Sequence, residues 1–196
     1  MARKTGSHAD ITGPKVRQAA LGLFARHGYA AVSMRQIAGE VGVQAGALYT
    51  YTPDKQSLLF DLMRGHMDEL LEARAQRDVI GDPLAQLDDF TGFHIQFHLD
   101  RVDAVFLSYM ELRNLSPENF TEITRLRGVY EGELEAILTN GVEAGLFVLD
   151  DVKITVMAII ALLTGLTSWY REGGRVPRTQ IEQIYIQLVR GAVGVT

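Results

Sequence analysis

His94 and His98 are four residues apart, so on a helix both imidazole rings would lie on one face and could bind one metal ion. The glutamate and the third ligand of a hydrolytic zinc motif do not accompany them, and the chain has no Glu-x-x-His motif of a di-iron bundle. Cysteine is absent, which excludes disulfides, thiolate metal sites and a cysteine nucleophile. We therefore predict no metal site and no cofactor, and we interpret both histidines as polar pocket or core residues.

The acidic residues do not predict catalysis either. Asp88 and Asp89 are adjacent, and adjacent side chains on a helix point in different directions. No arrangement of nucleophile, base and orienting acid is evident, so we predict that the protein is not an enzyme. An all-α enzyme is the alternative, and turnover of a thioester would support it.

Aromatic residues, histidines and a few arginines instead predict an apolar ligand pocket between helices of the acidic C-terminal part. Arg113 and Arg127 lie in otherwise apolar helical patterns and would need an acidic partner, which a ligand carboxylate or phosphate could supply. The alternative is that most of the aromatic residues are plain core. The candidate lining residues are Phe93, His94, Phe97, His98, Tyr109, Met110, Arg113, Arg127, Tyr130, Trp169 and Tyr170.

Nearly every segment of the 196 residues has helical periodicity, which predicts an all-α fold. A first helix presents an apolar stripe and ends at His27 and Gly28. Ser33 and Gln36 form a capping box for a second helix that ends near Gly42. A third short helix is expected at about 44–51. The apolar face of 55–71 predicts a long helix joining a domain of residues 1–55 to one of residues 56–196.

Further helix starts are predicted where a capping residue precedes proline, at Asp82 and Ser116. Asp150 or Asp151 would begin another helix, and a box from Thr179 to Glu182 the last one. The expected total is eight or nine helices.

Residues 154–170 carry no charge, so a membrane span must be weighed against a buried helix. At 1.5 Å per residue the run covers roughly 26 Å, which is short of a ~30 Å hydrocarbon core. We interpret it as a helix packed in the core and against a second subunit, with no membrane contact. The last helix has a wide apolar stripe and would complete a homodimer interface; alternatively, both helices pack within the monomer. The stripe consists of Ile181, Ile184, Tyr185, Leu188, Val189 and Ala192.

Charge is unevenly distributed along the chain. The formal net charge is −5, but residues 1–55 carry seven bases and three acids. A basic N-terminal part on an acidic remainder indicates a polyanion partner, or else chance segregation of surface charge. The polar N-terminus has no apolar run of a secretory signal, so we expect a cytoplasmic protein.

Residues 33–51 have the pattern of a helix-turn-helix: a capped short helix, a glycine-containing turn and a second short helix that could enter a major groove. The motifs AALGLFARHGY (19–29), SMRQIA (33–38), VGV (41–43), GALY (46–49) and PDKQSLL (53–59) resemble the TetR family of one-component transcriptional repressors. The resemblance implies three DNA-binding helices followed by six helices for ligand binding and dimerisation.

By family position, the resemblance implies groove contacts from Gln44, Ala45, Gly46, Thr50 and Tyr51, and phosphate contacts from Tyr49 and Lys55. Ser33 and Arg35 would lie near the DNA backbone or a base. Gln44 could read adenine, Ala45 or Ala47 could touch a thymine methyl group, and Gly46 allows close approach. Leu48 is expected in the core, and Tyr49 and Tyr51 could also be packing residues.

This chain departs from the family pattern at two positions. Tyr51 and Thr52 stand where the family often has His-Phe, and Ala45 stands where lysine is common. The recognition helix therefore carries no charge, and affinity would depend more on Lys55, Arg35, Lys15 and an arm formed by Arg3 and Lys4.

The segments 98–103 (HLDRVD) and 169–175 (WYREGGR) are similar to the TetR subgroup that controls lipid, steroid or aromatic-acid catabolism and often responds to acyl-CoA thioesters. This resemblance implies that Arg171 and Arg175 would meet CoA phosphates; the alternative is a solvated basic turn. The function predicted overall is a homodimeric repressor of a double-stranded DNA operator, released by a small apolar or acyl-CoA-like effector. A drug-efflux regulator, an activator, and a helical interaction module without DNA binding are the alternatives.

Overall fold

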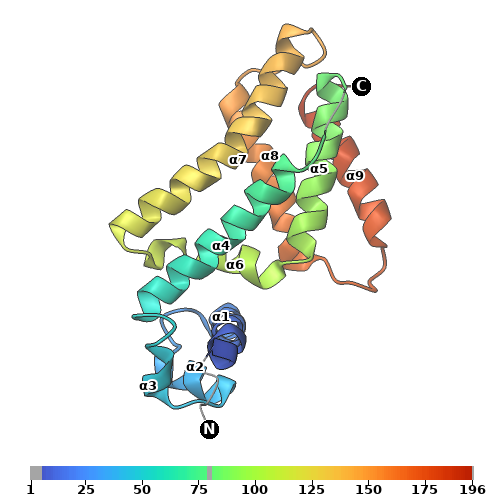
Figure 1. Cartoon of the computed structure of the whole chain (residues 1–196). Coiled ribbons are helices and arrows are strands. Elements are labelled where there is room, and N and C mark those ends of the chain that lie inside the picture. The colour runs from blue at the N-terminus through green and yellow to red at the C-terminus, as the bar shows by residue number, and fades with distance from the viewer. Residues whose placement is uncertain (1–5, 79–80, 196) are drawn as a thin grey trace. The chain divides into compact units, whose positions relative to one another are not determined.

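The computed structural model describes residues 6–78 and 81–195 of the chain (Figure 1). These residues form nine α-helices and one short 3-10 helix, and none of them lies in a strand, which confirms the all-α prediction. The helices are α1 (Gly6–His27), α2 (Met34–Val41), α3 (Ala45–Leu48), α4 (Lys55–Ala75), α5 (Pro83–Leu99), α6 (Val102–Met110), η1 (Leu112–Asn114), α7 (Pro117–Glu143), α8 (Val152–Trp169) and α9 (Arg178–Ala192).

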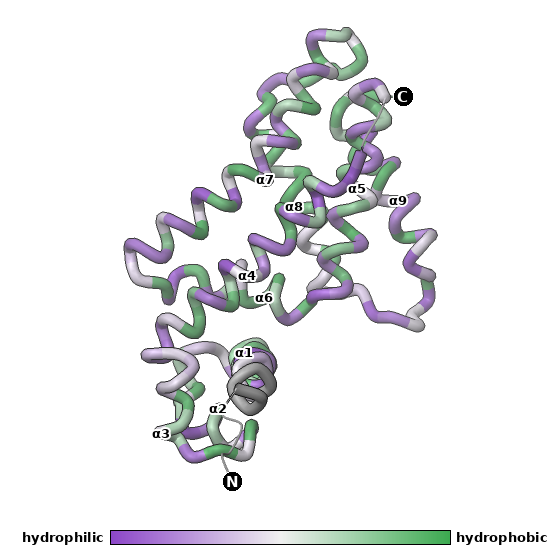
Figure 2. The backbone as a smooth tube through the Cα atoms, viewed as in Figure 1, coloured by the Kyte–Doolittle hydropathy of each residue, from purple (hydrophilic) through white to green (hydrophobic). Residues whose placement is uncertain are grey.

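The chain divides into two compact units. The first, here called the head unit, comprises the residues up to Met67 together with Asp103–Ile123; the second, the body unit, comprises Asp68–Val102 and the residues from Thr124 onward. Helices α4 and α7 each contribute residues to both units. In Figure 2 polar and apolar segments alternate along α7, as expected for a helix with one apolar face.

In the head unit, α1 packs on α2, and α2 packs on α3. The predicted apolar stripe of α1 is buried through Val16, Ala20, Leu23 and Phe24. Gly28 ends α1 with a φ of 80°, a left-handed conformation that glycine adopts without a steric penalty. The predicted end of the first helix is therefore confirmed.

In the body unit, α5 packs against α8 and α9. The predicted caps are confirmed for α5 and α8, where the carboxylates of Asp82 and Asp151 accept hydrogen bonds from the backbone N–H groups of Ala85 and Ile154, both at 2.9 Å. The Ser116 hydroxyl accepts a longer bond of 3.4 Å from the Asn119 backbone at the start of α7.

The predicted box from Thr179 to Glu182 is wrong. The N-cap of α9 is Pro177, whose backbone is extended, and the helix begins one residue before Thr179, at Arg178. The Glu182 carboxylate does not turn back to the helix start; it accepts hydrogen bonds of 3.0 Å from the Gln96 side chain on α5. Tertiary packing thus uses the residue that the local pattern assigned to a cap.

Helix α8 is the one helix among the described residues that is long and apolar enough to cross a membrane by length and composition. One of its sides is packed into the body unit through Val156, Ile159, Leu163 and Leu166. The other side is exposed, and only 33% of the helix is buried inside the chain. Of the predicted packing in the core and against a second subunit, the chain itself thus provides the core side only.

Candidate nucleic-acid interface

The capping box that begins α2 forms as predicted. The Ser33 hydroxyl oxygen accepts a hydrogen bond from the Gln36 backbone N–H at 3.3 Å, and the Gln36 side-chain oxygen accepts one from the Ser33 backbone N–H at 2.8 Å. Gly42 ends the helix with a φ of 76°, so the chain turns sharply before Gln44. These two local features fix the angle at which α3 leaves α2.

Helix α3 presents one buried and one exposed side. Leu48 is fully buried and holds the helix on the head, as expected. Gln44, Gly46 and Ala47 are exposed, and a methyl group added at Gly46 would meet nothing within 4 Å. Regular helix ends at Leu48, so α3 is shorter than the predicted 44–51. The residues after it form turns that continue the exposed surface.

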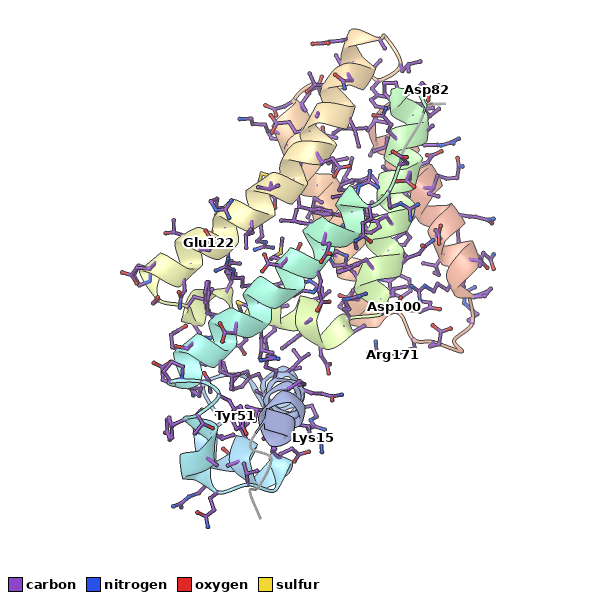
Figure 3. All side chains as sticks on the ribbon, in the orientation of Figure 1. Lys15, Tyr51, Asp82, Asp100, Glu122 and Arg171 are labelled. Carbon is purple, nitrogen blue, oxygen red and sulfur yellow. The ribbon has the colours of Figure 1, made fainter. Side chains whose placement is uncertain are left out.

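The residues after α3 differ in how they are placed. Tyr49 is 57% exposed. The exposed Thr50 donates its hydroxyl to the Ala47 carbonyl at 2.7 Å. The ring of Tyr51 is only partly exposed and lies against Gly13 of α1, where an added methyl group would be 3.6 Å from its Cδ1 (Figure 3). Of the two tyrosines, Tyr51 thus has the packing contact and Tyr49 the free surface.

Four lysine and arginine side chains of α1 and α2 are exposed: Lys15, Arg17 and Arg26 on α1, and Arg35 on α2. None of them forms an ion pair or hydrogen bond with another residue in the part of the chain that the structure describes. Lys15, for example, is labelled on α1 in Figure 3. Unpaired ammonium and guanidinium groups are what DNA phosphates require, because no internal carboxylate competes for them. Arg3 and Lys4 of the predicted arm lie outside the described residues.

Lys55 differs from these four cations. Its ammonium group donates hydrogen bonds to the carbonyl oxygens of Tyr29 and Val32, both at 2.9 Å, and lies 4.2 Å from the centre of the Tyr29 ring. The side chain is only partly exposed. Lys55 therefore holds the loop between α1 and α2 from the first turn of α4.

In the body unit, the predicted ligand residues His94, His98, Phe93, Phe97 and Tyr130 come together. The two imidazole rings are stacked, with centres 3.8 Å apart and planes at 4°. Both histidines are buried. The His98 Nδ1 atom lies 2.8 Å from the His94 carbonyl, and because a carbonyl can only accept, Nδ1 carries the proton.

Both ring nitrogens of His94 are engaged by hydroxyl groups. Nδ1 lies 3.1 Å from the Tyr130 hydroxyl, and Nε2 lies 3.3 Å from the Thr164 hydroxyl. The stacked rings are thus part of a hydrogen-bonded cluster that joins α5, α7 and α8. No group of three or more metal-ligating side chains occurs among the described residues.

The other predicted ligand residues are not all in this core. Tyr109 and Arg113 belong to the head unit, and Arg113 is exposed in η1, so the premise that it is embedded in an apolar helix face is wrong. Arg127 is partly exposed on α7. Trp169 is 53% exposed at the end of α8. The exposed Arg171 donates to the Tyr170 carbonyl at 2.8 Å.

The buried arginine of the body unit is Arg74, which sequence reasoning missed. It pairs with Asp89 of α5 and Glu133 of α7 and lies 5.5 Å from the ring centres of Phe90 and Phe93. Arg74 occupies the helical position that follows Met67 and Leu70 on the buried stripe of α4. An arginine continuing an apolar stripe was the available signal for a buried ion pair.

Glu111, just after α6, was also missed. Its carboxylate is 8% exposed and accepts a hydrogen bond of 3.0 Å from the Tyr29 backbone N–H. A carboxylate at the C-terminal end of a helix is electrostatically disfavoured, because that end carries partial negative charge. A glutamate at the C-terminal end of a predicted helix was therefore the feature of the sequence that could have indicated a specific contact.

Two family models match the chain. One, described as bacterial regulatory proteins of the tetR family, matches residues 16–62, and the other, described as the tetracyclin repressor-like C-terminal domain, matches residues 81–193. The HTH-type transcriptional repressor KstR2 of Mycobacterium tuberculosis is 28% identical over 179 residues, which cover 89% of this chain and 88% of the relative.

Solved structures show the same fold. A bacterial regulatory protein of the tetR family from Rhodococcus RHA1 has a TM-score of 0.87 and 27% identity, covering 94% of this chain and 98% of that one. AibR in complex with isovaleryl coenzyme A and operator DNA has a TM-score of 0.83 at 22% identity, covering 91% and 97%. The chain belongs to the TetR family of ligand-responsive transcriptional repressors.

Proposed function

We propose that this protein is a homodimeric repressor that places two copies of α3 in successive major grooves of a palindromic operator, with centres about 34–36 Å apart or slightly more. The observation that carries the proposal is the head surface itself. The side of α3 opposite the buried Leu48 is exposed, and the four exposed cations of α1 and α2 have no partner among the residues that the structure describes.

The proposed DNA contacts follow from this placement. Gln44 offers a paired donor and acceptor to an adenine edge, Ala45 a methyl group to thymine, and Gly46 space for close approach of the backbone. Tyr49 and Arg35 are exposed enough to meet phosphates. We assign supporting positions at the edge of this surface to Ser33, Thr50 and Tyr51, whose side chains already make contacts within the head.

Dimerisation is proposed through α8 and α9. Their outer sides expose large apolar side chains that nothing within the described chain covers, and such a surface is typical of an interface. Ile154 and Met157 are 66% and 69% exposed. On α9, Ile184 and Leu188 line an open groove together with Gln180, Gln183 and Gln187. The further exposed apolar side chains of α8 are Leu162 and Trp169.

The proposed effector is a small apolar molecule or an acyl-CoA thioester. Support comes from the aromatic core of the body unit. There His94 hydrogen-bonds to Tyr130 and Thr164, and each of these three groups could exchange its internal partner for a neutral carbonyl or hydroxyl group of the effector. The exposed Arg171 and Arg175 are available for CoA phosphates. The neighbouring AibR structure contains isovaleryl coenzyme A, and the KstR2 structure is described as a ketosteroid regulator.

Effector binding would act through α4, which contributes residues to both units. A shift of this helix would spread the two heads and weaken operator binding. The coupling is reciprocal, so operator must weaken effector binding by the same factor. Identical effector affinity with and without operator would remove this mechanism.

We further propose that the effector is bound without being turned over and that the protein acts in the cytoplasm, where operator DNA and thioesters are both present. Intact thioester after prolonged incubation supports binding alone, and released free CoA supports the enzyme alternative. A non-CoA ligand would instead favour the drug-efflux alternative.

The test is fluorescence anisotropy with DNA from beside the gene, over a salt series and with a panel of CoA thioesters that includes isovaleryl-CoA, with free CoA as control. For specific binding, the logarithm of the affinity should fall by about 0.9 for each phosphate contact when the salt concentration rises tenfold. Release by one thioester establishes the effector class. Specific binding that no thioester disturbs rejects that class and keeps the repressor. Absent or salt-independent DNA binding favours the interaction module.

A further inference from the structure

A closed set of hydrogen bonds joins three parts of the head unit. Tyr29, in the loop between α1 and α2, donates its backbone N–H to Glu111 and accepts at its carbonyl from Lys55. Glu111 accepts from the Asn114 side chain, and the Asn114 carbonyl accepts from the Gln56 side chain at 2.7 Å. Lys55 and Gln56 are neighbours at the start of α4, which completes the ring.

This ring joins segments that belong to different family domains. Tyr29, Lys55 and Gln56 lie in the part matched by the N-terminal family model, whereas Glu111 and Asn114 lie in the part matched by the C-terminal one. All five residues belong to the head unit. The end of α6 is therefore attached to the DNA-binding helices by specific polar contacts.

The chemistry of Glu111 points to a role in positioning. The carboxylate is buried near the C-terminal ends of both α6 and α1, where the helix dipoles disfavour negative charge. Its partners are a backbone N–H and a side-chain amide, and it forms no ion pair with a cation of the described residues. Its Oε1 atom lies 3.4 Å from the position that a Cβ at Gly28 would occupy, which is an ordinary contact distance, so the carboxylate packs directly on this turn.

We propose that Glu111 and Lys55 hold the Tyr29 peptide from its two sides and so position the α2 and α3 helices for operator binding, without touching DNA themselves. Tyr29 is four residues before the Ser33 cap of α2, so a shift of this peptide is transmitted directly to the helix-turn-helix. The proposal rests on the operator binding proposed above. It replaces the phosphate contact that the family resemblance implies for Lys55.

The test for Glu111 uses the sign of a charge effect. Removing a negative charge should by itself strengthen binding to DNA. We expect Glu111→Gln to weaken operator binding by about tenfold instead, because one of the two oxygens that accept from Tyr29 and Asn114 becomes an NH2 group, which can only donate. Binding to non-specific DNA should not weaken. The matched control is Glu118→Gln, which removes an exposed carboxylate of the same unit and should not weaken operator binding.

The test for Lys55 uses the salt slope. Lys15→Met removes an exposed, unpaired ammonium group and should lower the slope of log affinity against log salt by about 0.9 if that group meets a phosphate. Lys55→Met should weaken operator binding by about tenfold or more with the wild-type slope, because a positioning residue releases no counterion. A slope lowered by about 0.9 in Lys55→Met would show that Lys55 contacts DNA and would overturn its assignment.

Amide hydrogen exchange separates positioning from loss of folding. In Glu111→Gln the Tyr29 amide should exchange faster while amides of α5 keep their wild-type rates. If Glu111→Gln and Glu118→Gln have the same operator affinity, the inference is overturned, provided that the wild type discriminates operator from non-specific DNA. If the wild type binds operator and non-specific DNA equally, the proposed function is contradicted instead. The exchange rate of the Tyr29 amide in Glu111→Gln then still shows whether Glu111 holds the loop.

Discussion

Arg190 near the end of α9 pairs with Asp88 near the start of α5, with its Nε donating to Oδ1 at 2.9 Å. Arg178 at the start of α9 pairs with Asp100 at the end of α5 at 2.6 Å. The spacing of the two arginines along α9 equals the spacing of the two aspartates along α5. The pairs therefore fix both the antiparallel direction and the register of the helices, and the side of α9 that carries Ile184 and Leu188 stays exposed.

The first prediction concerns this register. Because both side chains of the Arg190 pair are partly exposed, we expect a coupling free energy of only about 0.5–1 kcal/mol. It is measured by urea unfolding in a double-mutant cycle of Arg190→Gln and Asp88→Asn. Arg175→Gln, which removes an exposed arginine without an ion pair in the described chain, should leave stability unchanged. A coupling of zero would show that the Arg190 pair does not contribute to the register.

The second prediction concerns two glycines of α7. A methyl group at Gly141 would lie 1.9 Å from Cδ2 of the buried Phe147 ring, whereas one at Gly132 would meet nothing within 4 Å. Gly141→Ala should therefore destabilise the protein by about 1–3 kcal/mol through overpacking. Gly132→Ala should be neutral or stabilise it by up to about 1 kcal/mol through helix propensity. Thermal unfolding of both variants is the measurement, and equal melting temperatures would contradict the clash.

Local sequence patterns predicted those helix starts and ends that are determined by residues close together in the sequence. The Ser33 box, the Asp82 and Asp151 caps and the Gly28 stop all act within one turn of the chain, so their residues are visible in the sequence. The start of α9 was predicted wrongly because Glu182, the expected capping-box residue, accepts a hydrogen bond from Gln96 of α5 instead.

Long-range polar contacts could not be predicted in the same way. The sequence analysis singled out Arg113 as an embedded arginine, but the buried one is Arg74, and only its ion pairs with Asp89 of α5 and Glu133 of α7 show this. Similarly, the family position implied a phosphate contact for Lys55, while the fold gives its ammonium two carbonyl partners from a loop distant in sequence. A sequence shows the residue type, but the partners come from tertiary structure.

The third prediction concerns pH. Burial acts to raise the pKa of the Asp89 carboxyl, but hydrogen bonds from Arg77 and Arg74 outweigh it and hold the pKa below its ordinary value of 3.8. A folded-state pKa below the unfolded one gives stability that is present above the unfolded pKa and is lost as pH falls through the folded one. The difference in unfolding free energy between wild type and Asp89→Asn, about 1–3 kcal/mol, should be constant from about pH 5 to 7 and shrink below about pH 4.

Chemical denaturation at several pH values measures this difference. Asp103→Asn is the control, since Asp103 is exposed and forms no ion pair with the described residues. A difference for Asp89→Asn that grows at low pH would contradict the sign, because it would require a raised pKa in the folded state.

The fourth prediction concerns the dimer. Met157→Glu places a charge on the exposed side of α8 and should convert the protein to a monomer, because an unpaired charge cannot be buried in an apolar interface. Light scattering after gel filtration measures the mass. The single tryptophan, Trp169, should then emit at longer wavelength, as its exposed part is no longer covered. The control is Val129→Glu, at an exposed apolar position of α7, which should stay dimeric. If Val129→Glu were monomeric and Met157→Glu dimeric, the interface would not lie on α8.

The last prediction concerns base recognition. Gln44 is exposed at the N-cap of α3 and its side chain forms no cap hydrogen bond, so both its donor and its acceptor are available to a base. Gln44→Ala should weaken operator binding by about 1–3 kcal/mol, leave non-specific binding unchanged and keep the salt slope, because no phosphate contact is lost. Gln18→Ala, an exposed glutamine of α1, should bind operator like the wild type. Equal weakening on operator and non-specific DNA would mean that Gln44 contacts the backbone, and that the reading of bases lies with the apolar surface of Ala45 and the backbone at Gly46.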